Sequence, residues 1–289
     1  MRGLRKLKNL KIRHVKLASA VLIILLILSI SSYGYLFYKS YAKDEFVDTS
    51  IEIANRSQES VFRLSKVLFY HNANAEDNSR DKSLQNLSIS QYSDIAIYID
   101  NTTYITDLTK QNTVKELWID NIQVNADTEK GSPYLNYKNL NNFGSFQLLD
   151  VPSEERISFS IVNTNAENEV ADYSKPTFYA DCSNPISLGY INRNIFEKFS
   201  ISDENPSVTF NGKLLKQAGI PLESLHYVLS FDINIVNYEN QRFVYHASFD
   251  ISLIDDGNSL YEGDLQQIRN FGEGTEYNFF KVGLWYYSW

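Results

Sequence analysis

The strongest pattern in the chain is in residues 225–253, which read LHYVLSFDINIVNYENQRFVYHASFDISL. Apolar side chains take every second position in both halves of this stretch, which is the period of a strand with one buried face. A long β-hairpin is therefore predicted at the centre of the fold. The two apolar sets are Leu225, Tyr227, Leu229, Phe231, Ile233 and Ile235, and then Phe243, Tyr245, Ala247, Phe249, Ile251 and Leu253.

The register of this hairpin follows from the positions of its apolar residues. Side chains on one face must pair across the strands, and both sets have odd numbers, so the numbers of two paired residues must add to an even value. The segment 237–241 then fits a connecting loop of three or five residues. Ile235 is expected opposite Phe243 and Phe231 opposite Ala247, and a large side chain facing a small one suits an interdigitated core.

Short runs of Ile, Val, Tyr, Trp and Thr, separated by Asn and Asp, predict further strands elsewhere in the chain. Clean alternation of apolar and polar residues is typical of antiparallel sheets that pack face to face. We expect a mainly β fold, an antiparallel two-sheet, sandwich-like ectodomain with short helices. The expected strands are 94–99, 103–108, 113–124, 146–150, 156–163, 207–211 and 277–289, and the expected helices are 192–198 and 212–219.

Residues 17–38 carry no formal charge and predict a transmembrane helix. These 22 residues would make a helix of roughly 33 Å, close to the ~30 Å thickness of the hydrocarbon core of a bilayer. Twelve of them are Leu, Ile, Val or Phe, which together favour insertion by roughly 4–7 kcal/mol. The sequence therefore predicts a signal-anchor helix whose partner is the lipid bilayer.

The charges around this span predict its orientation. Residues 1–16 carry seven Lys or Arg side chains, and no acidic residue occurs before Asp44. An excess of basic residues marks the cytoplasmic side, so 1–16 is expected to be a cytoplasmic stub and the rest an extracytoplasmic part of a single-pass cell-membrane protein. Such a short basic leader is typical of bacterial proteins. Alternatively, residues 18–30 are the apolar region of a cleaved signal peptide, and the protein is secreted.

Residues 39–90 are polar, contain no Gly or Pro, and are expected to form a juxtamembrane stalk and loop. Seven residues in this range follow a spacing of four and three, which is that of one face of a helix. A polar loop is expected at 71–83, and the β-rich extracellular domain is expected to be 91–289. The seven residues are Val47, Ile51, Ala54, Gln58, Val61, Ser65 and Leu68.

Charge excludes one class of partner. Beyond the basic stub the chain has 20 basic and 35 acidic side chains, a net charge of about −15. Because nucleic-acid phosphates would repel this acidic body, nucleic acid is not expected as a partner.

The sequence offers no strong metal site. In the predicted register His246 lies opposite Asp232 as a surface pair, and His226 is roughly 20 Å from His246 at ~3.3 Å per residue. Two imidazoles so far apart cannot bind one ion. Calcium is the best of the weak ligand hypotheses, because oxygen-rich loops at the ends of a sandwich can bind it, although Asn and Asp are also ordinary turn residues. The oxygen-rich positions expected in loops are Asp100, Asp120, Asp127, residues 163–169 and residues 255–257.

No catalytic motif is found. The Gly-x-Ser-x-Gly elbow of hydrolases is missing. The lone Cys182 follows Phe178-Tyr179-Ala180-Asp181, which differs from the Thr-Leu-x-Thr-Cys strand of sortases, and Asp181 would raise the pKa of its thiol. Cys182 is expected to be a small buried hydrophobe. No catalytic, cofactor-binding or metal-ligand residue is therefore predicted.

Two function classes remain. The first is a non-enzymatic binding or assembly module at the cell surface, with an envelope protein or glycan as partner. The second is a membrane-tethered cell-envelope hydrolase or transpeptidase, which would need a nucleophile and a base within hydrogen-bond reach. The C-terminal aromatics Trp285, Tyr286, Tyr287 and Trp289 are expected in a last core strand, or alternatively to stack on a partner.

Overall fold

The computed structural model describes residues 21–39, 41, 43, 60–101, 108–145, 156–163, 172, 174–201 and 209–282. The chain divides into two compact units, Met1–Asn55 and Arg56–Trp289. In the first unit one helix, Val21–Lys39, is long and apolar enough to cross a membrane. A signal sequence would meet the same criterion, and residues 17–20 of the predicted span lie outside the described residues.

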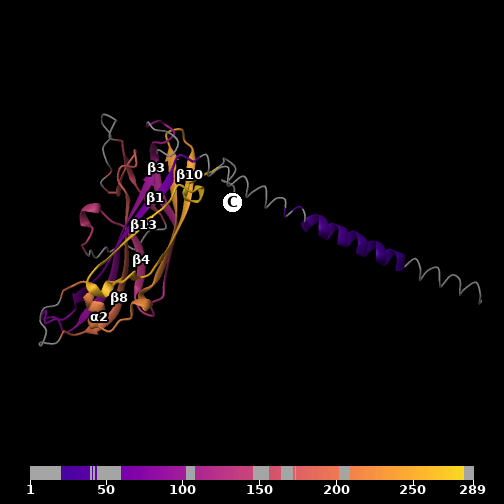
Figure 1. Ribbon diagram of the computed structural model, residues 1–289. Helices are drawn as coiled ribbons and strands as arrows, with labels where there is room; N and C mark the ends of the chain where they lie inside the picture. The colour runs from indigo at the N-terminus through magenta and orange to yellow at the C-terminus, as the bar shows by residue number, and fades with distance from the viewer. Residues whose placement is uncertain are drawn as a thin grey trace, which may run out of the picture. The chain divides into compact units, whose positions relative to one another are not determined.

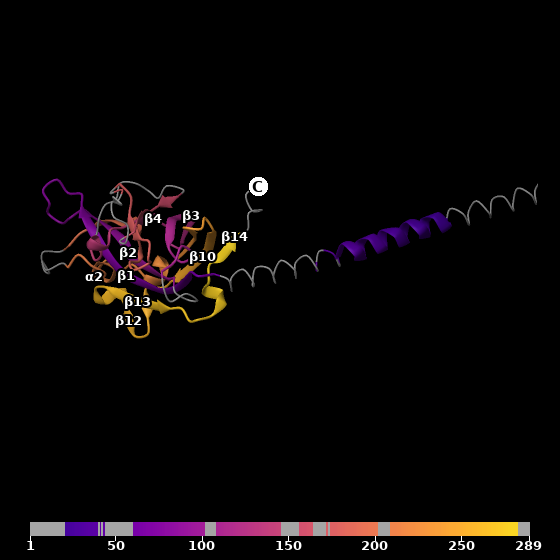
Figure 2. The ribbon, with the colours of Figure 1, turned by 90° about the horizontal axis from the view of Figure 1, so that it is seen from above.

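The second unit is built mainly from two five-stranded antiparallel sheets (Figures 1 and 2). Sheet A has the strand order β13-β1-β2-β8-β4, and sheet B has the order β14-β10-β9-β3-β5. The strands of sheet A are β1 (Arg63–Asp77), β2 (Leu87–Asp100), β4 (Ser132–Tyr137), β8 (Ile186–Phe199) and β13 (Leu265–Asn270). Those of sheet B are β3 (Val114–Ala126), β5 (Ile157–Ser158), β9 (Tyr227–Asn237), β10 (Arg242–Ile251) and β14 (Phe280–Val282).

Short elements connect these strands. Two further pairs are the parallel β6 (Ser160–Val162) and β7 (Thr177–Tyr179), and the antiparallel β11 (Ile254–Asp255) and β12 (Asn258–Ser259). The helical turns are η1 (Leu140–Asn142), α2 (Lys213–Gln217), η2 (Leu222–Leu225), η3 (Leu260–Glu262) and η4 (Thr275–Tyr277).

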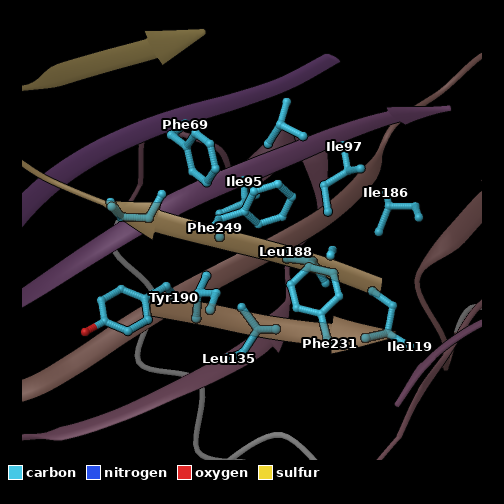
Figure 3. Close-up of a cluster of buried hydrophobic side chains, with 14 of the residues drawn as sticks. Phe69, Ile95, Ile97, Ile119, Leu135, Ile186, Leu188, Tyr190, Phe231 and Phe249 are labelled. Atoms are coloured by element: carbon cyan, nitrogen blue, oxygen red, sulfur yellow. The ribbon is translucent and has the colours of Figure 1, made fainter. Parts of the chain in front are cut away.

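One hydrophobic core takes side chains from both sheets, as Figure 3 shows for Phe69, Ile95 and Leu188 of sheet A with Phe231 and Phe249 of sheet B. The rings of Phe69 and Phe249 meet edge to face with their centroids 5.6 Å apart. An aromatic pair of this kind contributes about 0.5–1.5 kcal/mol beyond the area that it buries. The apolar alternation of each strand therefore reflects contact with the opposite sheet.

The predicted hairpin is confirmed as β9 and β10. Phe231 pairs with Ala247, Ile235 with Phe243, and five residues separate the last pair, Val236–Arg242. The loop closes on itself because the Asn237 N–H donates to the Gln241 carbonyl at 3.0 Å. The odd-numbered residues of both strands face the core, and nearly all of them are buried.

The predicted helical stalk and loop are wrong for residues 63–77, which form β1 in the interior of sheet A. A β-bulge shifts the pairing between Leu64 and Lys66, so Leu64 and Val67 both face the core at a spacing of three. That spacing resembles a helical one, although the alternation resumes at once with Phe69 and His71. The β-rich part therefore begins before residue 91.

The predicted helix at 192–198 is also wrong, because these residues belong to strand β8. The pairing of β8 with β2 shifts twice here, and Asn194 and Lys198 both have positive φ angles. As a result Asn192 and Ile195 are both buried at a helix-like spacing of three.

The remaining expectations have mixed outcomes. Residues 94–99 form part of β2, 113–124 form most of β3, and 156–163 contain β5 and β6. Within 212–219 the helix is α2, and within 277–289 the described strand is β14. The expected strand at 146–150 lies outside the described residues, as do 103–107, 207–208 and 283–289, and residues 209–211 form no strand.

Replacing Ala247 by Phe tests the hairpin register. The side chain at 247 is fully buried opposite Phe231, so the larger ring should overpack the core and lower the free energy of unfolding by about 1–3 kcal/mol. Urea unfolding of the purified chain measures this loss. Ser248→Phe, at the neighbouring exposed position, is the control and should change stability by about 0.5 kcal/mol or less. Equal unfolding of both variants would contradict the register.

Candidate ligand pocket

A buried ion pair holds the segment 138–145 against the outer face of sheet A. Asp94 lies near the middle of β2, where its side chain points away from the core, and the Lys138 ammonium donates a hydrogen bond to it. The exposed fractions of the two side chains are 1% and 5%. Gly189 on β8 pairs with Asp94, and the Lys138 stem passes over it at van der Waals distance, since a Cβ there would lie 3.5 Å from Lys138 Cδ.

The backbone of the same segment completes this contact. The Gly144 N–H donates to the other Asp94 oxygen at 2.6 Å, and Lys138 Nζ also donates to the Ser145 carbonyl at 2.9 Å. Gly144 has a φ of +77°, a conformation that glycine adopts without strain. The segment therefore covers the Asp94 carboxylate, which lies on the outer face of a strand that is buried along most of its length.

Burial sets the electrostatics of the pair. It raises the pKa of the Asp94 carboxyl, and the hydrogen bonds from Lys138 and Gly144 partly offset this effect. Burial likewise lowers the pKa of the Lys138 ammonium, against the attraction of Asp94. Each charge is therefore tolerated only because the other is present.

A pocket of about 180 Å³ opens beside this pinned segment. Leu140 and Tyr179 are its most exposed apolar side chains, at 40% and 37%, while Phe159 is buried. Four segments of the chain contribute to it. Its lining residues are Lys138, Asn139, Leu140, Asn141, Phe159, Pro176, Thr177, Tyr179, Asn184 and Ser187.

Main-chain groups around the pocket already have partners. The Lys138 N–H donates to the Ser187 carbonyl at 3.0 Å. The Tyr179 N–H donates to Asn184 Oδ1 at 2.6 Å, and Asn184 Nδ2 donates to the Thr177 carbonyl at 3.1 Å. These bonds hold Lys138 to Ser187 of β8 and hold β7 to the Asn184 side chain, so the Asn184 amide is also engaged.

The pocket has little capacity for acid–base chemistry. The described residues that line the pocket include no Asp, Glu, His or Cys, and their one charged side chain, that of Lys138, is bonded to Asp94. The polar groups that remain are amides and hydroxyls, notably those of Asn139, Asn141 and Thr177. Such a lining can orient a polar ligand by hydrogen bonds but offers no poised proton donor or acceptor.

The structure keeps the two predicted surface histidines apart, and His246 Nδ1 lies 2.8 Å from Asp232 as expected. His226 has two partners that the sequence analysis missed: its Nδ1 and Nε2 lie 2.8 and 2.7 Å from Asp127 and Asp250. The hydrogen bond to Asp250, followed by that to Asp127, raises the pKa of His226. Both ring nitrogens are therefore engaged by carboxylates.

The carboxylates considered for calcium do not all lie in loops. Asp100 ends β2 and pairs with Arg63 at 2.8 Å, while Asp120 lies within β3 and accepts bonds from Trp118 and Asn234. In the described part of the chain, no three His, Cys, Asp or Glu side chains gather as a metal site. The other positions are 163–169, of which only Asn163 is described, and 255–257, at the turn between β11 and β12.

Cys182 is buried, as expected. Burial raises the pKa of its thiol, and the nearby carboxylates of Asp181 and Asp100 raise it further. A thiol held protonated in this way is a poor nucleophile.

One serine does lie within hydrogen-bond reach of a histidine. Ser93 Oγ is 2.7 Å from His71 Nδ1, and His71 Nε2 is 3.2 Å from Gln267 Oε1. Gln267 Oε1 can only accept, so Nε2 carries the proton and Nδ1 accepts from Ser93, whose oxygen accepts from the Tyr227 hydroxyl at 2.9 Å. Gln267 Nε2 then donates to the Ser252 carbonyl at 2.9 Å.

This chain of bonds joins sheet A to sheet B inside the protein. His71, Ser93 and Tyr227 are fully buried, and none of them lines the pocket. Burial lowers the pKa of His71 to about 4, so the imidazole is neutral near pH 7. A base with such a low pKa and no access for substrate is poorly suited to activate Ser93.

The sequence analysis missed the pocket and its ion pair. Asp94 directly precedes the run IAIYI of a buried strand, and an acid within such a strand is the one signal that could have indicated a paired partner. Nothing in the sequence links Asp94 to Lys138, 44 residues away.

Comparison of the chain with known protein families, with curated proteins and with solved structures finds no match. The pocket's own geometry and chemistry are therefore the basis for a functional proposal.

Replacing Lys138 by Met should break the ion pair that holds the segment 138–145 to Asp94. The buried Asp94 would lose its counter-charge, and breaking a buried pair in this way costs about 3–5 kcal/mol of stability. Urea unfolding should show a smaller loss at pH 5 than at pH 8, because the raised pKa lets Asp94 take up a proton. Lys130→Met, at an exposed position, is the charge-matched control and should have little effect.

His71 should make the fold less stable in acid. Its pKa is about 4 in the folded protein, against an ordinary value of 6.5 in the unfolded chain. The unfolded chain therefore binds more protons between these two values, and stability falls as the pH falls through this window. From pH 7 to pH 4.5 the loss from His71 is about 2–3 kcal/mol.

The matched variant for this test is His71→Gln. Comparing urea unfolding of the two proteins at both pH values isolates His71, because His226 contributes equally to each. A pH dependence that is the same in the variant would contradict the assignment.

Proposed function

We propose that this protein is a membrane-anchored extracytoplasmic module that binds a cell-envelope partner without catalysing a reaction. Its N-terminus lies in the cytoplasm, and residues 17–38 anchor it in the bilayer. The observation that carries the proposal is the pocket, whose described lining combines exposed apolar side chains with neutral polar groups and includes no acid–base pair.

The anchor is supported by the apolar helix Val21–Lys39 and by the seven basic residues in 1–16. The alternative is a cleaved signal peptide, which would release the same module from the cell. Both readings have the β-rich unit outside the cytoplasm.

A sandwich-like ectodomain is supported by the common core of the two sheets. Side chains of β1, β2 and β8 pack with those of β9 and β10 in one cluster (Figure 3). Aligned antiparallel sheets that share a core in this way are typical of modules displayed at cell surfaces.

A membrane-tethered hydrolase or transpeptidase is the second candidate, and the contact between His71 and Ser93 favours it. Three observations weigh against it: both residues are fully buried, the His71 pKa is about 4, and burial raises the pKa of the Cys182 thiol. The binding module is therefore preferred.

The test uses a single accessible cysteine. Leu140→Cys places a thiol at the pocket, Ile268→Cys places one on the exposed face of β13, and the buried Cys182 should not react. In intact cells of the native host, a membrane-impermeant maleimide carrying a photoreactive group should label both variants. After illumination, only Leu140→Cys should give a discrete product of higher mass.

Each other outcome has a defined meaning. Labelling that requires permeabilised cells would contradict the orientation, and labelled protein in the medium without its N-terminal tag would support secretion. Identical products from both variants would show that the pocket is not the binding site.

A further inference from the structure

We propose that the pocket binds a neutral carbohydrate, with one sugar ring against Tyr179 and its hydroxyls bonded to the surrounding amides. This inference rests on the proposed binding function and names the class of ligand. Three properties of the pocket support it: its charge, the hydrogen bonds that its backbone groups already make, and its combination of apolar and neutral polar side chains.

Charge excludes ionic ligands. A phosphate or carboxylate group would require a free cation, yet Lys138, the one cation among the described lining residues, already donates to Asp94 and to the Ser145 carbonyl. An ammonium group would require a carboxylate, and the part of the lining that the structure describes contains none. An unpaired charge in the pocket would lose hydration free energy without gaining an ion pair. The ligand is therefore neutral.

The backbone disfavours an extended peptide. A peptide that adds to a sheet edge binds through free main-chain N–H and C=O groups. Around this pocket the Lys138 N–H, the Tyr179 N–H and the Thr177 carbonyl are already bonded within the protein. Recognition must therefore come from side chains.

The side chains suit a polyhydroxyl ligand. Each sugar hydroxyl both donates and accepts, and the exposed amides of Asn139 and Asn141 offer both functions. The Thr177 hydroxyl adds a further group of the same kind, whereas Ser187 is buried and its hydroxyl donates to the Pro185 carbonyl at 3.5 Å.

The mouth of the pocket supplies an apolar surface. Tyr179 and Leu140 remain 37% and 40% exposed, one on β7 and the other in η1. A sugar ring presents an apolar C–H face and a polar edge, so it can cover an aromatic ring while its hydroxyls reach the amides. Single exposed apolar residues are common, but here two of them flank a polar pocket.

Calorimetry of the full chain in detergent micelles tests the proposal. The probes are glucose, galactose, mannose, N-acetylglucosamine, maltose and chitobiose, with glucosamine, N-acetylneuraminic acid and inorganic phosphate as charged comparators. At least one neutral sugar should bind, and the charged comparators should not.

Three variants locate the binding. Tyr179→Ala should weaken it about tenfold or more, whereas Tyr179→Phe, which keeps the ring, should change it by about threefold or less. Tyr137→Ala removes a tyrosine that is 44% exposed and does not line the pocket, so it should leave the affinity unchanged. Thermal unfolding of each variant checks that it is folded.

The outcomes separate this inference from the function on which it rests. Binding of a charged comparator alone, or sugar binding that Tyr179→Ala does not weaken, would overturn the carbohydrate assignment. A pocket-specific product from Leu140→Cys that contains no sugar would overturn the ligand class and leave the binding module intact. If no sugar binds and no product forms, both proposals fail.

Discussion

The constraint on which the structure depends is that both sheets must bury their apolar faces in one core. A strand turns alternate side chains to opposite faces, so a shift of one residue in β9 or β10 would move its whole apolar set into solvent. Contacts such as Phe69–Phe249 between the sheets, and the stacking of Tyr190 on Tyr227, hold this arrangement together. At one place where polar groups enter the core, the His71 imidazole bonds to Ser93 through Nδ1 and to Gln267 through Nε2.

The outer face of sheet A is shaped by the requirement that a buried polar group must have hydrogen-bond partners. Asp94 projects from the middle strand of that sheet and would be costly to cover without a partner. Lys138 and the Gly144 N–H supply the partners, and in doing so they bring η1 toward β7. The pocket is thus a consequence of how the sheet satisfies one carboxylate.

Sequence reasoning was accurate where a single period ran without interruption. The hairpin gave a correct register because its apolar residues alternate over both strands, and Phe231 does face Ala247. It failed at β1 and β8, where bulges near Ser65 and Asn194 introduce spacings of three that resemble a helix. A bulge is set by tertiary pairing, so local pattern alone does not reveal it.

The site was beyond prediction for a different reason. Its parts come from η1, β7 and the residues around 159 and 187, and the ion pair that positions them joins distant points of the chain. A histidine or a cysteine suggests a chemical role from the sequence alone. Asparagine and tyrosine side chains are common on protein surfaces, so they indicate a site only when the fold brings them together.

The solitary, enclosed Cys182 has a consequence for biogenesis. Because no second thiol exists in the chain, maturation requires neither an oxidase nor an isomerase, and no mispaired bridge can form. The β-rich unit should therefore reach the same native state whether it is made in reducing or in oxidising surroundings.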